Sequence, residues 1–359
     1  MTSCLLHLRK ATKQGTISGP YIWNLKQPMS DTFNAIVAED IDGHCQATLK
    51  QISLSDLSDE AVLVDVAYST LNYKDGLAVG NPKRICRKLP LTCGIDLAGT
   101  VLESRDPQFK TGDRVLVNGY GLSEVHNGGY SQKQRLKPEW LVRIPDTFSE
   151  EEAMAIGTAG YTAMLCVMAI QDHGLTPEDG PVLVTGAAGG VGTVAISLLS
   201  TLGFEVTAAT GRVEETGEFL RSLGASALID RSELARDCKP MEEETWAAVV
   251  DTVGDKMLAC AIAQTKYEGI VAACGLAGGI ALPSTVMPFI LRGVTLRGVD
   301  SVHASLSRRQ RAWDTLAEIL NKQQLKDIYT VEAMSDVPEL AQRIIKGDIR
   351  GRVVIDVKR

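Results

Sequence analysis

The sequence predicts an α/β protein with a β-rich domain and a second domain built on a doubly wound parallel sheet. A length of 359 residues suggests about two domains. Short strand-like runs broken by turns fill residues 33–141. From about residue 150, apolar strand-like runs alternate with helix-like segments, which is the pattern of a parallel sheet covered by helices on both faces.

The composition is that of an ordinary globular protein, with 45% hydrophobic and 23% charged residues. A formal net charge of -7 argues against nucleic acid as a partner. The eight cysteines include no C-x-x-C pair, which favours free thiols and a cytoplasmic location. We expect no membrane partner, on the premise that no apolar run approaches the roughly 18 uncharged residues of a membrane span.

Residues 1–29 are kept apart from the fold prediction. Up to residue 28 they contain four basic residues and no acidic one, a composition that can be interpreted as a transit peptide. They contain neither a long apolar core nor an evident cleavage site. We therefore expect a disordered extension, or a start codon assigned too early, because Met29 stands just before strand-like sequence.

The β-rich domain is expected over residues 30–155. Val62, Val64 and Val66 alternate with other side chains and predict a strand with one solvated face. Ser149 precedes three glutamates, so we expect it to cap a helix whose first turn is negatively charged.

The parallel-sheet domain is expected over residues 156–298, with helices at about 191–202 and 214–223. The chain is then expected to return to the β-rich domain over residues 299–359. This last segment contains an amphipathic helix around Trp313 and ends in the strand-like run GRVVIDV.

A glycine-rich turn stands between a strand and a helix at residues 186–192. Glycines let the backbone approach a pyrophosphate, and the helix N-terminus presents unpaired N–H groups to it. The pattern is not a strict G-x-G-x-x-G because Ala187 holds the first glycine position, but its strand–turn–helix context predicts a dinucleotide site. The candidate cofactor-binding residues of the turn are Gly186, Ala188, Gly189, Gly190, Val191 and Gly192.

The end of the next strand discriminates between nicotinamide cofactors. NAD-binding units usually place a carboxylate there, whereas this chain has Thr210, Gly211 and Arg212. Arg212 can pair with a 2′-phosphate, so we expect NADPH rather than NADH, with Thr210 and Arg212 as cofactor-binding residues. The alternative is that Arg212 is only a solvated side chain on a loop.

The domain order resembles the medium-chain dehydrogenase/reductase superfamily, which implies a GroES-like catalytic domain and a Rossmann-type cofactor domain. The segments LNYKDGLA, GIDLAGTV, VTGAAGGVG, STVMPFILRGV and GRVVIDV resemble the acryloyl-CoA reductase group of quinone-oxidoreductase-like proteins. The resemblance covers about residue 33 to the end; Cys93, where proline is expected, departs from it. It implies NADPH-dependent reduction of acryloyl-CoA to propanoyl-CoA.

The superfamily's zinc enzymes have a metal-binding cysteine near the position of Tyr73 and a His-Glu pair where Ile95 and Asp96 stand here. A four-cysteine lobe for structural zinc is also missing, because Cys86 and Cys93 are the only cysteines in that region. Zinc sites need convergent thiolates or imidazoles. We therefore expect no metal.

Reduction of an α,β-unsaturated thioester needs hydride at the β-carbon, stabilisation of the enolate and a proton at the α-carbon. Tyr73 is the candidate proton donor or hydrogen-bonding group, and Asn72 the candidate that orients the nicotinamide or its ribose. Lys74 and Asp75 are expected to pair and hold the loop, with Asp96 bracing the same cluster. The alternatives are that Asp75 only caps a helix, or that water supplies the proton.

Four further residues lie where related folds pass near the nicotinamide: Thr158, Cys274, Leu276 and Ser301. Each could equally be a packing residue. Coenzyme A carries several phosphate charges, so basic residues are expected at the entrance to the site. The candidates are Lys74, Arg84, Arg87, Arg308 and Arg309, although charged runs are usually solvated faces.

The apolar run near residue 295 could form an edge strand, and in relatives such strands pair to make a homodimer. Two other functions stay open. One is an NADPH-dependent quinone or enone reductase of the same fold, which has no need of phosphate anchors. The other is a non-catalytic NADPH-binding module, for which the polar NYKD cluster would be superfluous.

Overall fold

The computed structural model describes residues 32–359, and two of its sheets are largely antiparallel. The smaller has the order β2–β1–β4, and the larger has the order β15–β16–β3–β5–β6–β8 with β7 paired to β3. The strands of the smaller sheet are β1 (Thr32–Ile41), β2 (His44–Ser53) and β4 (Leu91–Thr92). Those of the larger are β3 (Val62–Leu71), β5 (Asp96–Ser104), β6 (Arg114–Asn118), β7 (Lys133–Leu136), β8 (Val142–Arg143), β15 (Tyr329–Ala333) and β16 (Arg352–Asp356).

The third sheet has the order β11–β10–β9–β12–β13–β14, and all its neighbouring strands are parallel. This is the strand order of a doubly wound dinucleotide-binding sheet. In such a sheet the order in which successive strands are added reverses once, here between β9 and β12. The predicted fold class is therefore confirmed. The strands are β9 (Val182–Thr185), β10 (Val206–Thr210), β11 (Ala227–Asp230), β12 (Trp246–Asp251), β13 (Thr265–Ala273) and β14 (Thr295–Gly298).

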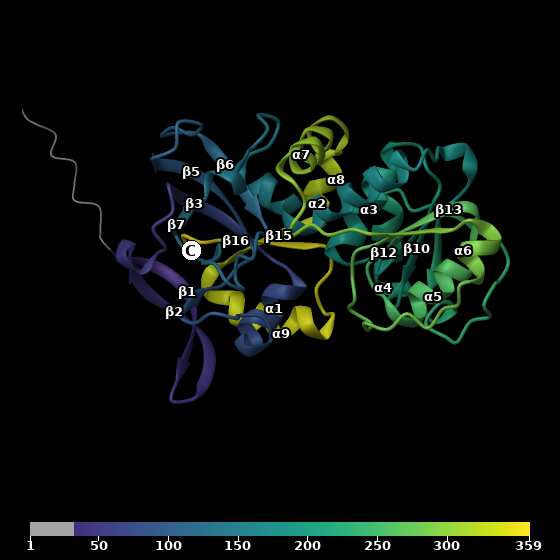
Figure 1. Cartoon of the computed structure of the whole chain (residues 1–359), viewed down its shortest axis with the longest axis horizontal. Coiled ribbons are helices and arrows are strands. Elements are labelled where there is room, and N and C mark those ends of the chain that lie inside the picture. Colours follow the sequence, from purple (N-terminus) through teal and green to yellow (C-terminus); the bar gives the residue numbers. More distant parts are fainter. Residues whose placement is uncertain (1–31) are drawn as a thin grey trace, which may run out of the picture. The chain divides into compact units, whose positions relative to one another are not determined.

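Helices cover both faces of the parallel sheet. One core cluster joins α2, α3 and α4 to one face, and another joins α5 to the opposite face. The α1 and α9 helices contact each other beside the β-rich sheets (Figure 1). The helices are α1 (Tyr73–Gly80), α2 (Glu150–Asp172), α3 (Gly190–Thr201), α4 (Val213–Ser222), α5 (Asp255–Ala263), α6 (Met287–Arg292), α7 (Leu306–Ile319), α8 (Lys322–Ile328) and α9 (Val337–Lys346).

The α2 helix connects the β-rich part to the parallel-sheet part. It begins after Ser149, whose hydroxyl accepts the backbone N–H of Glu152 at 3.0 Å, so the predicted cap is confirmed. It contacts β3 and β5 as well as α3 and β13. The boundary expected at residue 155 falls inside this helix, just before a kink at Gly157, where φ is +51°.

The premise that no apolar run approaches 18 uncharged residues was wrong. Residues 153–170 of α2 carry no charged side chain. Among the described residues, α2 is the one helix long and apolar enough to cross a membrane by length and composition, but 94% of that window is buried inside the fold. A helix that is apolar all round and covered on every side is typical of a protein core.

The C-terminal segment contributes to both parts of the fold. Its α7 and α8 helices contact α2, with the buried Trp313 and Leu316 facing the core. Its last strand, β16, pairs antiparallel with β3 of the β-rich sheet. The backbone N–H of Gly351 donates to the carbonyl of Ala188 at 3.0 Å, so β16 begins against the glycine-rich turn. The expected extension of residues 1–29 lies outside the described residues.

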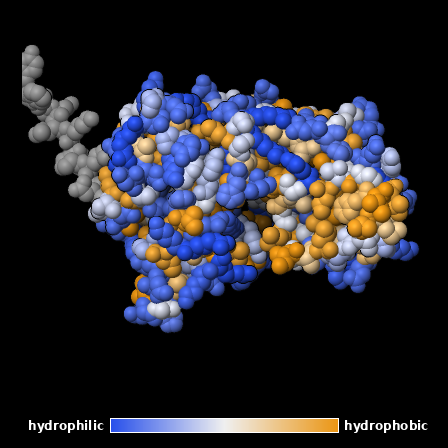
Figure 2. Space-filling model, in the orientation of Figure 1, coloured by the Kyte–Doolittle hydropathy of each residue, from blue (hydrophilic) through white to orange (hydrophobic). Residues whose placement is uncertain are grey.

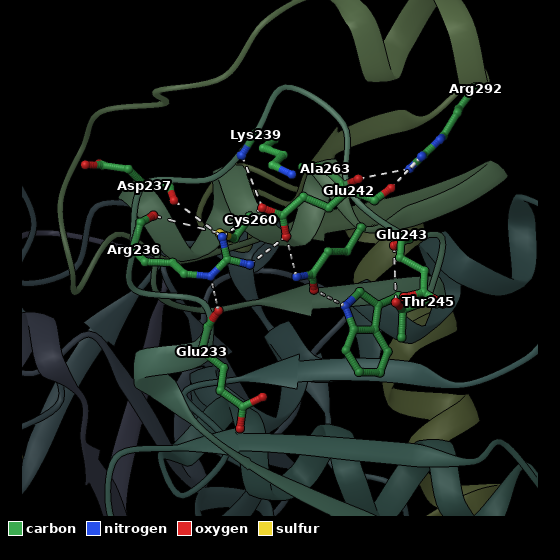
Figure 3. A network of polar contacts seen from close by, with 12 residues as sticks. Glu233, Arg236, Asp237, Lys239, Glu242, Glu243, Thr245, Cys260, Ala263 and Arg292 are labelled. Carbon is green, nitrogen blue, oxygen red and sulfur yellow. Dashed lines mark hydrogen bonds and ion pairs between the residues drawn. The ribbon is translucent and has the colours of Figure 1, made fainter.

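A polar network closes the amino end of the parallel sheet (Figure 3). Arg236 donates twice to Glu242, at 2.8 and 2.6 Å, and Gln264 donates to the same carboxylate at 2.9 Å. These hydrogen bonds, led by those from Arg236, lower the pKa of Glu242 to about 2. Gln264 in turn accepts the indole N–H of Trp246, the first residue of β12. Because Arg236 and Glu242 neutralise each other, this network fastens the sheet, and neither of these two charges is free for a ligand.

Candidate active site and cofactor site

Asp96 is fully buried and accepts hydrogen bonds from three groups in two separate segments. Thr70 donates its hydroxyl to the carboxylate at 2.8 Å, the backbone N–H of Thr158 donates at 2.8 Å, and the Asn72 amide donates at 3.3 Å. Thr70 lies in β3, Asp96 begins β5, and Thr158 follows the kink in α2. Asp96 therefore ties two strands of the β-rich sheet to the helix that continues into the other part.

Asp75, also fully buried, accepts the backbone N–H groups of Asn72 and Ile95, each at 2.9 Å. The first of these bonds caps α1, as the helix-start alternative predicted. The second fixes the residue just before Asp96. Burial, with the nearby Asp96 carboxylate, raises the pKa of Asp75 to about 7. Asp75 is thus a positioning group inside the cluster.

The expected pair between Lys74 and Asp75 is wrong. Lys74 forms an ion pair with Glu124 instead, because Asp75 points inward while the lysine side chain lies outward on the same helix turn. Burial lowers the pKa of Lys74. Arg87, another candidate for substrate binding, approaches the same Glu124 carboxylate at 3.8 Å.

Tyr73 and Asn72 are adjacent in sequence but differ in whether their polar groups are free to contact a ligand. Both ends of the Asn72 amide are engaged, donating to Thr70 and Asp75 and accepting from Arg352. Tyr73 is 41% exposed, and within residues 32–359 its hydroxyl has no hydrogen-bond partner. Of the two, Tyr73 is the group that can meet a ligand, whereas Asn72 holds the cluster together.

Arg352, which the sequence analysis missed, begins β16 and is 3% exposed. Its Nη1 donates to the Asn72 side chain at 3.3 Å, and its Nη2 has no partner among the described residues. A Cβ placed on Gly157 would lie 2.6 Å from Nη2 and 3.2 Å from Asp96 Oδ2, and a Cβ on Gly190 would lie 3.0 Å from Nη1. The guanidinium therefore lies between the carboxylate cluster and the glycine-rich turn. The available signal in the sequence was an arginine directly before the apolar run at residues 353–355.

The glycine-rich turn leads from β9 into α3. Gly189 is the N-cap and has no side chain to accept the first-turn N–H groups, so these donors are available to an anion. Gly186 has φ of +60°, and a Cβ on Gly192 would lie 2.6 Å from its carbonyl oxygen, which only glycine allows. The candidate residues of the turn, including Ala188, Gly190 and Val191, lie together.

Three arginines from separate segments gather near the end of β10. Arg212 directly follows the strand, and a Cβ on Gly211 would lie 2.7 Å from the side chain of Arg231. Arg350 places its guanidinium 4.3 Å from the ring of Phe219 in α4. Arg212 also donates to the carbonyl that precedes Arg350, at 3.3 Å. Sequence reasoning found Arg212 but missed the other two, because both come from distant parts of the chain.

The remaining cofactor candidates lie at the carboxyl edge of the parallel sheet or in the segment after it. Thr210 ends β10, Cys274 and Leu276 follow β13, and Ser301 lies between β14 and α7. The Cys274 thiol donates to a backbone carbonyl at 3.3 Å, and Leu276 is 62% exposed. Their contacts with a cofactor, and that of Thr158, stay predictions.

The assignment of Arg309 to a surface phosphate site is wrong. Arg309 is 1% exposed and donates to the carbonyls of Asn118 and Val302, each at 2.6 Å, with its guanidinium 4.0 Å from the ring of Tyr120. It braces the chain between β14 and α7. Its neighbour Arg308 is half-buried, and Arg84 is exposed.

Metal ligands do not gather in the part of the chain that the structure describes. Across residues 32–359, no three His, Cys, Asp or Glu side chains form a group that could hold a metal ion. Chemistry without a metal stays a prediction.

Two family models together match most of the described residues. The alcohol dehydrogenase GroES-like domain matches residues 58–146, and the zinc-binding dehydrogenase model matches residues 190–321. The chain is 51% identical to acrylyl-CoA reductase AcuI of Ruegeria pomeroyi, over 90% of this chain and 99% of that protein.

The chain is also similar to a solved structure and to a relative that has a different name. The crystal structure of the yhdH oxidoreductase from Salmonella enterica in complex with NADP matches with a TM-score of 0.87 and 48% identity, over 90% of this chain and 99% of that one. The putative quinone oxidoreductase YhfP of Bacillus subtilis is 42% identical over 91% of this chain and 99% of that protein.

Replacing Asp75 by asparagine tests its raised pKa. The folded protein keeps this proton up to about pH 7, whereas an unfolded aspartate releases it near pH 4. The folded state therefore binds more protons between about pH 4 and 7, and the free energy of unfolding falls as pH rises through that window.

Urea unfolding between pH 4.5 and 8 should show that Asp75→Asn lacks this decline, which is at most about 1.4 kcal/mol per pH unit. The exposed Asp42→Asn variant is the control and should follow the wild-type profile. Parallel profiles for all three proteins would contradict the assignment.

Proposed function

The chain belongs to the acrylyl-CoA reductase group of the medium-chain dehydrogenase/reductase superfamily, and we propose that it reduces acryloyl-CoA to propanoyl-CoA with NADPH. The observation that carries the proposal is the placement of an exposed phenol, Tyr73, beside a buried cluster that also adjoins the glycine-rich turn. A cofactor on that turn and a substrate at Tyr73 would be neighbours.

The residues present fit NADPH. The first turn of α3 would hold the pyrophosphate, with Arg352 adding the one guanidinium nitrogen that lacks a partner among the described residues. Arg212, Arg231 and Arg350 would hold the 2′-phosphate, since these three guanidiniums gather near the end of β10 and residues 210–212 include no carboxylate.

The side chains near the turn would then stabilise the negative charge that develops on the thioester and supply the proton for the α-carbon. Bound NADPH supplies the hydride that the β-carbon of the thioester accepts. The phenol of Tyr73 donates a hydrogen bond to the thioester oxygen, or a proton to the α-carbon, as negative charge develops there. Asn72, Asp75 and Asp96 keep α1 in place so that Tyr73 stays at the site.

A quinone reductase of the same fold is the second candidate, supported by the name of the Bacillus relative. NADPH oxidation, followed optically, decides between the two with acryloyl-CoA, crotonyl-CoA and a simple quinone in parallel. We expect fast turnover of acryloyl-CoA with NADPH and slow turnover with NADH. Turnover of the quinone with none of either thioester would reject the proposal.

Removing the arginines at β10 should separate the two cofactors. In the Arg212→Ala/Arg350→Ala double variant we expect the KM for NADPH to rise at least about 100-fold, because two charge-assisted hydrogen bonds of about 1.5–3 kcal/mol each are lost. The KM for NADH should stay unchanged, since NADH lacks the 2′-phosphate. Arg221→Ala, near the opposite end of α4 from Arg212, is the control. Equal effects on both cofactors would contradict the assignment.

We also propose that the chain forms a homodimer through the outer edge of β14 and the surface of α6, and that it works in the cytoplasm. The segment before β14 exposes large apolar side chains: Ile280 at 90%, Ile290 at 71%, Val286 at 65% and Leu291 at 55%. Figure 2 shows the hydrophobic surface gathered over this part of the molecule. A patch of this kind beside an unpaired strand edge is typical of an interface.

The free thiols at the described cysteines support the proposed cytoplasmic location, because thiols stay reduced in a reducing compartment.

Ile290→Glu tests the interface, because it places a charge within the apolar patch. Light scattering should give about twice the 38.6 kDa chain mass for the wild type and the single-chain mass for the variant. The control is Ile41→Glu, which adds the same charge on β1 at a side chain that is 42% exposed. A dimer that survives Ile290→Glu would place the interface elsewhere.

A further inference from the structure

An open pocket of about 630 Å³ lies on the α2 side of the parallel sheet, between the end of α2, strands β13 and β14 and the first turn of α7. None of the cofactor candidates lines it. The polar side chains that line it and carry the argument are Asp172, His173, Arg297, Ser307, Arg308 and Arg311.

Three guanidiniums in this pocket face a single carboxylate. Arg311 donates two hydrogen bonds to Asp172, at 3.0 and 2.7 Å. These bonds hold the pKa of Asp172 below its usual range, and Arg308 and Arg297 act in the same direction. Neither Arg297 nor Arg308 has an ion-pair partner of its own within residues 32–359. The pocket therefore keeps an excess of positive charge in a chain whose formal net charge is -7.

The pocket is separate from the site proposed for the NADPH phosphates. Those phosphates would lie at β9 and β10, whereas the pocket adjoins β13 and β14. In the sheet, β14 lies three strand positions from β9, because β12 and β13 stand between them. At the usual strand spacing this is about 14 Å. One cofactor phosphate group cannot serve both places, so the pocket calls for a different anion.

The pocket is nevertheless connected to the nicotinamide side of the fold. Arg297 in β14 precedes Ser301 by four residues, about 13 Å of extended chain. The Ser301 carbonyl accepts from Arg309, the neighbour of Arg308, at 2.9 Å. Thr158, whose N–H donates to Asp96 beside Asn72, and Asp172 of the pocket lie fourteen residues apart on α2, about 21 Å at the usual helical rise. A ligand with a flexible arm of this length can have its thioester near Tyr73 and its charged end in the pocket.

We propose that this pocket binds the phosphate groups at the nucleotide end of coenzyme A. The inference rests on the proposed function and names the part of the substrate that the pocket recognises. One guanidinium can donate two parallel hydrogen bonds to the oxygens of one phosphate, and the Ser307 hydroxyl adds another hydrogen-bond donor. The other basic cluster fits less well, because Lys74 and Arg87 both approach the Glu124 carboxylate, which leaves Arg84 as the one guanidinium of that cluster's three candidates without an ion pair in the described residues.

The test compares acryloyl-CoA with acryloyl-pantetheine, which has the same reactive thioester and no phosphate. Wild-type kcat/KM should be higher for acryloyl-CoA. In Arg297→Ala/Arg308→Ala we expect kcat/KM for acryloyl-CoA to fall about 10- to 100-fold, mostly through KM, and that for acryloyl-pantetheine to stay unchanged. Arg343→Ala, an arginine on the distant α9, is the matched control.

Two outcomes would overturn the proposal. One is that the double variant keeps the wild-type preference for acryloyl-CoA; the other is that Arg84→Ala/Arg87→Ala removes the preference instead. Calorimetry with adenosine 3′,5′-bisphosphate supplies a readout independent of turnover. Wild type should bind it and the Arg297→Ala/Arg308→Ala variant should bind it at least tenfold more weakly. If wild type turns over neither thioester but binds the bisphosphate, the proposed function fails while the anion pocket stands.

Discussion

Two buried carboxylates and one buried guanidinium set the conditions that the rest of this structure has to meet. Asp75, Asp96 and Arg352 are each 3% exposed or less. Taking such charges out of water is costly unless hydrogen bonds and opposite charge compensate for it. Here the compensation comes from β3, from α1, from the kink of α2 and from the first residue of β16. The cluster is complete only when the C-terminal strand has returned to the β-rich sheet.

The same cluster explains why the cofactor turn and the candidate catalytic side chain lie next to each other. Arg352 lies against Gly157 and Gly190, so one side chain adjoins both the kink of α2 and the start of α3. Asn72 uses its whole amide inside the cluster and leaves its neighbour Tyr73 at the surface of the site. A phenol held in this way can act on a substrate without its own position depending on a flexible loop. The positioning therefore comes from buried electrostatics, and the chemistry from an exposed group.

Local patterns in the sequence predict the helices and strands, whereas long-range contacts determine the roles of the individual site residues. The helix expected at 191–202 is Gly190–Thr201, and Ser149 caps α2, because strand–turn–helix periodicity and capping depend on residues a few positions apart. Arg352 meets Asn72 across 280 positions, and no local pattern identifies such a partner. The same limit explains why sequence alone pairs Lys74 with its neighbour Asp75 and predicts a surface position for the buried Arg309.

A double-mutant cycle between Asp96 and Arg352 tests most directly whether this cluster joins the two parts of the fold. The free energy of unfolding would be measured for wild type, Asp96→Asn, Arg352→Gln and the double variant at one pH near 7.5. Coupled groups should give an interaction free energy of about 1–3 kcal/mol, with the double variant less destabilised than the sum of the single variants. Additive effects within about 0.5 kcal/mol would show that the two residues act independently, and would contradict this account.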